Sequence, residues 1–271
     1  VDFPHYRAET FYPQMALKTK LPSADFEVYA CYADIYRDSD KYGFVPDNLN
    51  ENCVRRFIEL THEKYKASVG KYFGKTVPGI FTDEPKAGGI FPYTDALFDT
   101  FTELFSYDLR PLVYHLFVTV DERSKEIRKH YWLTVNHLYK KSFFDQIHNW
   151  CEENSIKFVG HVIAEEDPVN QVFTGGSTFS YMKYFDIPGF DIICDNLGNQ
   201  ERPALMFGAK LVSSAAHKEG KKKVFCEAMA CNPFNFGPAE MKRMTDWLYA
   251  MGITVIVPHG FHYSYDGHRK F

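Results

Sequence analysis

The chain has 271 residues and a formal net charge of −4; 45% of its residues are hydrophobic and 17% are aromatic. A globular chain of this length buries a large core, as one large domain or two small ones. The acidic balance and the one short basic run, Lys221–Lys223, argue against the basic surface of a nucleic-acid-binding protein. No apolar stretch reaches the length of a membrane span, so we expect no nucleic-acid partner and no membrane partner.

The cysteines and the two ends of the chain indicate the cellular compartment and whether the chain is part of a longer protein. The six cysteines are widely spaced and include no C-x-x-C pair, so neither a zinc motif nor a redox motif is present. Without a secretion signal at its start, the chain favours a reduced, cytoplasmic setting. It begins at Val1 and ends at Phe271, directly after a strand-like run. We therefore expect a fragment of a longer multidomain chain, with the other domains of that chain as partners.

The first elements are predicted as follows. The first 50 residues contain one strand-like run, at 26–36, between turn-rich segments. A helix is predicted over 53–70, because apolar residues recur at helical spacing and Asn50 or Asn52 can cap its start. The next run, “VPGIFTDEP” at 77–85, has the pattern of a strand that ends in two adjacent acids before a proline.

Helical pattern dominates the middle of the chain. Helices are predicted at 93–107, at 109–117 and at 122–155, the last of about nine turns. A strand at 156–167 follows and again ends in acidic residues. The segment “VFTGGSTFS” at 172–180 has no phosphate-loop lysine and is predicted to be a mobile loop.

The last third of the chain alternates strands with helices. Strands are predicted at 189–196, 222–231 and 253–264, and helices at the start of 176–196, at 202–220 and at 238–252. The strands are rich in Val, Ile and Phe without polar alternation, as expected when both faces of a parallel sheet are buried. This rhythm predicts an α/β fold.

Two folds share this rhythm, the open doubly wound sheet and the TIM (β/α)8 barrel. Polar residues of catalytic type follow nearly every strand, and only in a barrel do all the strand ends converge on one face. We therefore predict a TIM (β/α)8 barrel that forms a single catalytic domain over residues 1–271. About five to six barrel-type strands can be counted, so a complete ring of eight needs elements that this pattern does not reveal or that lie outside this chain.

Acidic residues and histidines follow the predicted strands at corresponding places. They are Asp83, Glu84, His161, Glu165, Glu166, Asp191, Asp195, Glu227, His259 and His262. Aromatic residues lie near them in sequence: Phe81, Tyr181, Phe234, Phe236, Phe261 and Tyr263. A barrel places such side chains around one mouth. Glycoside cleavage needs this composition, because one acid protonates the leaving oxygen while a second carboxylate activates water or attacks the anomeric carbon.

Other interpretations stay open at this stage. Each strand-end acid can instead face solvent or pair with a lysine, and a lone histidine in a strand is more often a satisfied core residue. The absence of H-E-x-x-H argues against a zinc hydrolase, and the absence of G-x-S-x-G argues against a serine hydrolase. Cleavage by carboxylates requires no cofactor, but an oxygen-rich cluster suits calcium, so calcium and any metal ligands are left open.

Five segments resemble, in the same order, the barrel of α-L-rhamnosidase-like glycoside hydrolases. They are “LTHEKYK…YFGKTVPGIFTDEP”, “WCEENSIKFVGHVIAEED”, “IPGFDII”, “SSAAHKEGKKKVFCE” and “DWLYAMGITVIVPHGFHYS”, and they span roughly residues 50 to 265. The resemblance implies the catalytic barrel of a glycosidase within a longer chain. The first strand that is usual in the family, rich in Trp, Tyr and acidic residues, is not found in this chain, so the resemblance implies that the first-strand region is missing. It also implies a carbohydrate substrate, such as a rhamnoside or a related plant or microbial glycan, and inversion at the anomeric carbon.

Three short motifs carry the resemblance onto single residues. The Gly-His-x-x-Ala-Glu-Asp pattern of the family matches residues 160–166, with Glu166 in place of Asp. Its Ser-Glu pair matches Cys226 and Glu227, and its Asn-Pro-His matches residues 257–259 with Val in place of Asn.

These matches imply roles for the strand-end residues. Glu165 is expected to be the general acid, and Glu227 the general base or nucleophile. Contacts to the carbohydrate are expected from Asp83, Glu84, His161, Glu166, Asp191, His259 and Tyr263. The alternative is a barrel that binds carbohydrate without cleaving it, and a divalent-metal hydrolase is a weaker one. Carboxyls of Glu165 and Glu227 close together at one end of the barrel would favour cleavage.

Overall fold

The computed structural model describes residues 43–193, 204–232 and 236–260, together with residues 31, 33, 37–39, 197 and 201. The chain divides into two compact units, Val1–Tyr32 and Ala33–Phe271, and all that follows concerns the second. The strand predicted at 26–36 lies outside the described residues except for Cys31 and Ala33. A single domain over the whole chain stays a prediction.

Five parallel strands form the central sheet, and their order in the sheet is their order in the chain. They are β3 (Gly79–Thr82), β4 (Lys157–Gly160), β5 (Ile187–Ile192), β6 (Phe225–Ala228) and β7 (Val255–Pro258). Sequential order is that of a barrel wall, whereas a doubly wound sheet reverses direction at a switch point. The prediction of a parallel barrel-type sheet is confirmed in part. The described residues make a curled half-barrel of five strands and not the complete ring of eight.

The segment before this sheet contains a small hairpin and a pair of helices. Strands β1 (Arg37–Ser39) and β2 (Gly43–Phe44) pair in antiparallel fashion. The predicted capped helix is present but divides into α1 (Glu51–Leu60) and α2 (His62–Val69), followed by the short 3-10 helix η1 (Gly70–Tyr72). Asn50 is the cap, because its side-chain oxygen accepts from Asn52 N at 2.9 Å and from Cys53 N at 3.2 Å.

The long helix predicted over 122–155 is also present, and it is not uniform. It runs as α4 (Arg123–Tyr139), a π-helical stretch η3 (Lys140–Asp145) and α5 (Gln146–Glu153). At the π stretch Ser142 Oγ donates to the carbonyl of Asn48, and Gln146 Nε2 donates to the carbonyl of Glu51 at 3.1 Å. These two bonds fix the start of α1 against the long helix. Before α4 lie α3 (Leu97–Phe105) and the 3-10 helix η2 (Arg110–Leu116).

The prediction of a loop at 172–180 is wrong except at residues 176 and 177, which lie between two helices. Residues Pro168–Gly175 form helix α6, because the side chain of Asp167 accepts from Val169 N at 2.9 Å and Asn170 N at 3.1 Å, and Pro168 suits the first turn. A second short helix, α7 (Thr178–Tyr181), follows directly. The predicted later helices are confirmed as α8 (Ala204–Lys218) and α9 (Pro238–Ala250).

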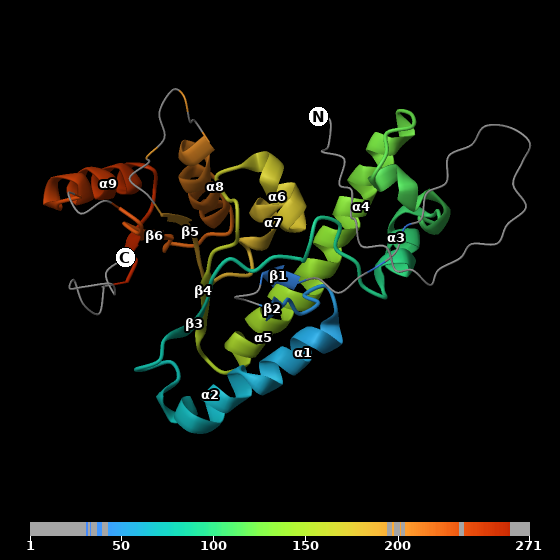
Figure 1. Ribbon diagram of the computed structural model, residues 1–271. Helices are drawn as coiled ribbons and strands as arrows, with labels where there is room; N and C mark the ends of the chain where they lie inside the picture. Colours follow the sequence, from blue (N-terminus) through green and yellow to red (C-terminus); the bar gives the residue numbers. More distant parts are fainter. Residues whose placement is uncertain are drawn as a thin grey trace, which may run out of the picture. The chain divides into compact units, whose positions relative to one another are not determined.

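The helices cover the strands in the manner of a barrel wall. Helix α5 packs against β4 and α8 against β5, as Figure 1 shows. Aromatic side chains fill the space between them: Phe144 stacks on Tyr181 with ring centres 4.6 Å apart, and Phe158 packs on Phe185 at 4.6 Å. These buried rings fix the position of β4, the strand that leads into the candidate site.

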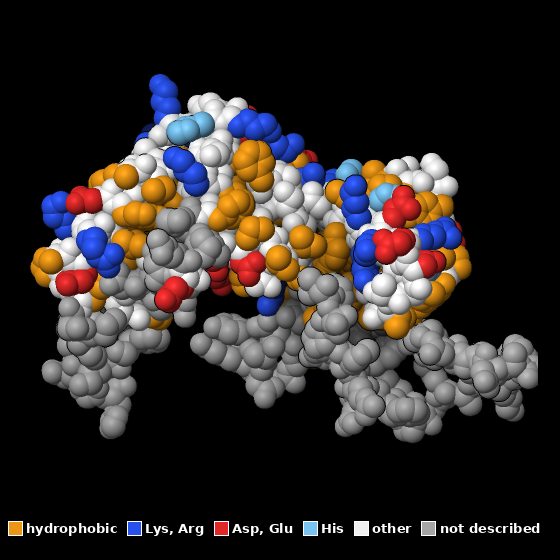
Figure 2. Space-filling view, turned by 90° about the horizontal axis from the view of Figure 1, so that it is seen from above, with side chains coloured by type: hydrophobic (Ala, Val, Ile, Leu, Met, Phe, Trp, Pro, Cys, Tyr) orange, Lys and Arg blue, Asp and Glu red, His pale blue; other side chains and the backbone are white. Residues whose placement is uncertain are grey.

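On the face drawn in Figure 2, hydrophobic side chains lie between Lys, Arg, Asp and Glu side chains. Scattered exposed hydrophobic residues of this kind are normal on a folded protein. Among the described helices, none is both long enough and apolar enough to cross a lipid bilayer.

Candidate active site

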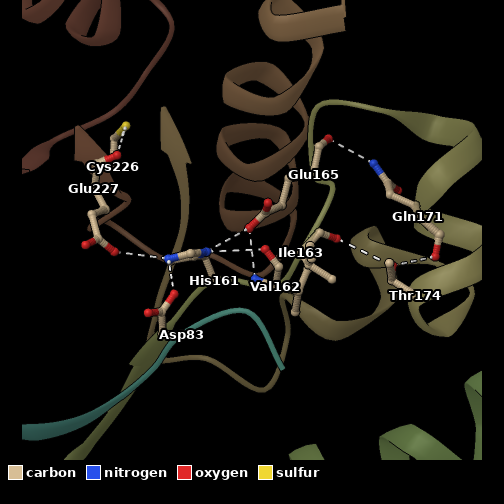
Figure 3. A network of polar contacts seen from close by, with 9 residues as sticks. All are labelled: Asp83, His161, Val162, Ile163, Glu165, Gln171, Thr174, Cys226 and Glu227. Carbon is tan, nitrogen blue, oxygen red and sulfur yellow. Dashed lines mark hydrogen bonds and ion pairs between the residues drawn. The ribbon is translucent and has the colours of Figure 1, made fainter. Parts of the chain in front are cut away.

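The carboxyl ends of the strands meet around one histidine. His161 comes directly after β4 and is fully buried. Its Nε2 lies 3.1 Å from Glu227 Oε2, on β6, and 3.3 Å from Asp83 Oδ1, directly after β3 (Figure 3). The three residues therefore come from three strands and lie far apart in sequence, as a barrel mouth requires.

The other ring nitrogen of His161 faces the backbone turn that follows β4. Nδ1 lies 3.4 Å from Glu165 Oε1 and 3.3 Å from the carbonyl oxygen of Val162. The same Glu165 oxygen accepts from Val162 N at 2.8 Å, and Gln171 Nε2 holds the Glu165 carbonyl at 2.9 Å. Only 1% of Glu165 is exposed. Glu165 therefore lies on the Nδ1 side of the ring, whereas Asp83 and Glu227 lie on its Nε2 side (Figure 3).

A further carboxylate, that of Asp191, approaches from β5. One carboxylate oxygen of Asp191, one of Glu165 and a ring nitrogen of His161 all lie within 4.8 Å of one another. Asp191 is paired in register with Glu227 on the neighbouring strand. Glu84 and Glu166 are close enough to affect the ionisation of Asp191. The structure thus brings six of the predicted acids together around His161: Asp83, Glu84, Glu165, Glu166, Asp191 and Glu227.

The ionisation of the buried groups follows from this crowding. Burial lowers the pKa of His161, but the hydrogen bonding and charge of Glu165, and then the charge of Asp191, outweigh burial, so this pKa is raised. Burial raises the pKa of Glu165, and the hydrogen bond and charge of His161 oppose it. The pKa of Asp191 rises from 3.8 to about 6, mainly through burial, with His161 opposing and nearby acids adding to the rise.

Glu84 combines accessibility with a shifted ionisation. Its side chain is exposed at the end of β3. Its pKa is raised, first by partial burial of the carboxyl and then by the charges of Asp83 and Glu166, while His161 opposes the rise. A carboxylic acid that is accessible and holds its proton to higher pH is suited to donate that proton.

Two phenylalanine rings pack against the ring of His161. The Phe81 ring lies 5.8 Å from the His161 ring and 5.6 Å from that of Phe225, centre to centre. Phe225 in turn lies over Gly189, where a Cβ atom would come within 2.0 Å of the Phe225 ring. The absence of a side chain at Gly189 therefore leaves space for the Phe225 ring. Phe81 is 47% exposed, so its ring is accessible to a ligand.

The backbone is strained where these strands end. Four non-glycine residues with positive φ follow β3, β4 and β6: Glu84 (43°), Ala164 (66°), Met229 (73°) and Cys231 (49°). Such conformations are uncommon for residues with a side chain and cluster at functional sites. Their positions agree with the placing of a site at this edge of the sheet.

The remaining predicted residues have different positions. His259 Nε2 lies 4.0 Å from Glu227 Oε1, and the histidine is half exposed. Tyr181 is not part of the site, because it is buried against Tyr139 and Phe144. Tyr263 and four other candidates lie outside the described residues: Asp195, Phe234, Phe261 and His262.

Sequence reasoning missed Gln171 and Phe225. Gln171 holds the turn that carries Glu165, and a glutamine six residues after an acid gives no signal of such a bond. Phe225 belongs to the strand predicted at 222–231, but its contact with Phe81 and Gly189 depends on the curl of the sheet.

The side chains were compared with the needs of a metal ion. Two sets bring their ligand atoms within 4.8 Å: Asp83, His161 and Glu227, and His161, Glu165 and Asp191. Calcium takes six to eight oxygen ligands, whereas each set offers two carboxylates and an imidazole. In both sets the ring nitrogen lies at hydrogen-bonding or ion-pair distance from the oxygens. The described residues therefore do not fit calcium as a complete site, and no step below depends on it.

Comparisons with known proteins agree with the geometry. The sequence profile of the alpha-L-rhamnosidase family, glycoside hydrolase family 106, matches residues 38–267. The structure of the rhamnosidase from Novosphingobium sp. PP1Y is similar, with a TM-score of 0.66 and 23% identity over 81% of this chain and 21% of that chain. No curated protein gives a significant match.

A second solved structure is less similar. The glycoside hydrolase domain of PgaB (BpsB) from Bordetella bronchiseptica gives a TM-score of 0.48 and 11% identity, over 89% of this chain and 63% of that one. The likeness to the Novosphingobium rhamnosidase shows a shared fold, and the present chain spans about a fifth of the length of that protein.

Proposed function

Because the chain belongs to the alpha-L-rhamnosidase family of glycoside hydrolases, we propose that it hydrolyses a glycosidic bond, with an α-L-rhamnoside as substrate. The observation that carries the proposal is the gathering of carboxylates from separate strands around His161. Most glycoside hydrolases cleave the bond with two such carboxylates on one site.

Glu227 is the proposed general base or nucleophile. One of its oxygens contacts His161 Nε2 at 3.1 Å, which fixes the orientation of the carboxylate. Its other oxygen faces the half-exposed His259, and 17% of the Glu227 side chain is accessible. A carboxylate that is oriented by a buried partner and open on one side can act on water or on the anomeric carbon.

The general acid must reach the leaving oxygen and must hold a proton near neutral pH. Glu165, which the family resemblance favours, has a raised pKa but is only 1% exposed. Glu84 also has a raised pKa, and its side chain is accessible. We therefore take Glu84 as the acid and keep Glu165 as the alternative to be tested beside it.

The other site residues are proposed to bind the sugar. Carboxylates accept hydrogen bonds from sugar hydroxyls, and an accessible aromatic ring stacks on the apolar face of a sugar ring. The residues proposed to do so are Asp83, Glu166, Asp191, His259, Tyr263 and, by stacking, Phe81.

A panel of p-nitrophenyl glycosides tests the proposal. We expect the purified protein to release p-nitrophenol from the α-L-rhamnoside faster than from other glycosides, and Glu227→Gln to abolish the release. Rhamnose binding by calorimetry without turnover on any glycoside would instead support a non-catalytic carbohydrate-binding barrel. Metal analysis of the same preparation tests separately whether the protein holds calcium.

A further inference from the structure

We propose that Glu165 is a positioning residue that keeps His161 doubly protonated, and that this buried imidazolium holds Asp83 and Glu227 together in the site. The inference deepens the proposed function, because it assigns a task to the one carboxylate of the cluster that substrate cannot reach. It rests first on what surrounds the two ring nitrogens.

Both nitrogens of His161 face oxygen atoms. Nε2 contacts Glu227 Oε2 and Asp83 Oδ1 at 3.1 and 3.3 Å, and Nδ1 contacts the Val162 carbonyl and Glu165 Oε1 at 3.3 and 3.4 Å. A neutral imidazole has one N–H and one lone pair. In this position the lone pair of a neutral ring would face oxygen lone pairs on one side. A ring with two N–H groups donates on both sides.

The backbone decides which member of the buried pair carries the proton. Glu165 Oε1, the oxygen nearest Nδ1, already accepts from Val162 N at 2.8 Å. An oxygen that accepts from a backbone N–H is best as a carboxylate oxygen, since a proton on it would compete with that bond. This bond leaves Oε1 without a proton. With Glu165 ionised and His161 charged, the buried carboxylate also has the paired charge that burial demands.

The charged neighbours of the ring favour its charge. Among the described residues, the titratable groups that face His161 are Asp83 after β3, Glu84 beside it, Glu165 in the turn after β4, Asp191 on β5 and Glu227 on β6. The remaining ring contacts are Phe81 and Phe225, which do not change charge with the ring. Each acid stabilises the imidazolium, and the imidazolium reduces the repulsion among the acids.

The positive ring has a geometric consequence. Asp83 Oδ1 and Glu227 Oε2 lie within 4.8 Å of one another, although β4 and β5 separate their strands. Two carboxylates this close repel each other unless one takes up a proton or a cation lies between them. The Nε2–H group contacts both carboxylates, and Glu165 fixes the ring at Nδ1. Without Glu165 the ring becomes neutral more easily, and Asp83 and Glu227 then lose the positive charge that holds them together.

The ring can be observed directly. In protein labelled with ¹⁵N in its histidines, the side-chain shifts of His161, assigned with His161→Gln, report its protonation during a pH titration. We expect wild type to stay doubly protonated from pH 5 to pH 8. In Glu165→Gln the ring should lose its proton at a pH at least one unit lower than in wild type. Gln171→Ala is the matched control, because it frees the same turn at the Glu165 carbonyl and spares the carboxylate.

Turnover supplies the second measurement. Glu165→Gln should lower kcat about tenfold with KM nearly unchanged and move one limb of the pH profile by a pH unit or more. The same exchange at an exposed acid of α1, Glu59→Gln, should keep the wild-type profile. A neutral His161 ring in wild type at pH 7, or the same titration in Glu165→Gln as in wild type, overturns the inference. The wild-type titration decides even if Glu165→Gln does not fold. The titration does not depend on enzyme activity. If the proposed function fails and the inference holds, the ring is charged and no glycoside is turned over.

Discussion

The two edges of the parallel sheet use charged residues in opposite ways. At the amino edge, Asp186 precedes β5 and accepts from Phe158 N at 2.9 Å and from Lys157 Nζ at 2.9 Å. At the carboxyl edge, carboxylates from several strands lie around the single ring of His161. The amino edge thus pairs its charges, whereas the carboxyl edge concentrates charges of one sign.

The difference shows which edge is built for stability and which for chemistry. A carboxylate that bonds a backbone N–H and a lysine stabilises the strands it joins. Clustered carboxylates repel one another and raise one another's pKa, so they are retained where proton transfer needs them. Substitutions of Glu84 and Glu227 at the carboxyl edge should change turnover more than stability, and substitutions of Asp186 at the amino edge should do the reverse.

The largest expected effect is that of Glu227→Gln. Removal of a base or nucleophile should lower kcat by about 10³-fold or more, while the thermal unfolding temperature changes little. Azide added to Glu227→Ala should restore part of the turnover, because a small anion can occupy the space of the lost carboxylate. Near-normal kcat in Glu227→Gln would remove this residue from the mechanism.

Glu84→Gln should have an effect that depends on the leaving group. With a poor leaving group kcat should fall about 10²-fold, because no acid then protonates the departing oxygen. With an activated dinitrophenyl glycoside the loss should nearly vanish, since that leaving group departs without protonation. If Glu165→Gln shows this dependence and Glu84→Gln does not, the acid is Glu165.

Asp191→Asn should change the pH dependence of stability. The pKa of Asp191 is raised from 3.8 to about 6, so its contribution to stability is present below about pH 4 and is lost as pH rises through 6. The free energy of unfolding of the variant, relative to wild type, should therefore increase between pH 4 and pH 7 by on the order of 2 kcal/mol, allowing for partial exposure. Urea unfolding at both pH values measures this, and a constant difference would contradict it.

Asp186→Ala should affect the opposite edge. Loss of the bond to Phe158 N should lower the free energy of unfolding by about 1 to 2 kcal/mol, because the backbone donor loses its partner. The ion pair with the exposed Lys157 adds little. Lys157→Ala is the matched control and should change stability by less. The pH profile of kcat should stay as in wild type in both variants, and a shifted profile would show that the two edges are coupled.

Much of the fold could be predicted from sequence, because it depends on local periodicity. The helix capped by Asn50, the nine-turn helix and the strands that end near Asp83 and Glu227 are all present near their predicted places. Helix α6 was missed because two glycines suggested a loop, whereas the Asp167 cap and Pro168 start a helix before them. The break at the π stretch depends on contacts with residues about 95 positions away, which periodicity does not show.

For the site, the sequence by itself determined which acids follow the strands and which family the chain resembles. The acids after β3, β4 and β6 are visible as strand ends, and parallel strands bring such ends to one edge. Only the tertiary structure decided on which side of His161 each acid lies. Glu165 and Glu166 are adjacent in sequence and chemically alike, but a turn with Ala164 at positive φ buries the first and leaves the second partly exposed. Burial and ring contacts depend on the curl of the whole sheet, and no local pattern in the chain encodes that curl.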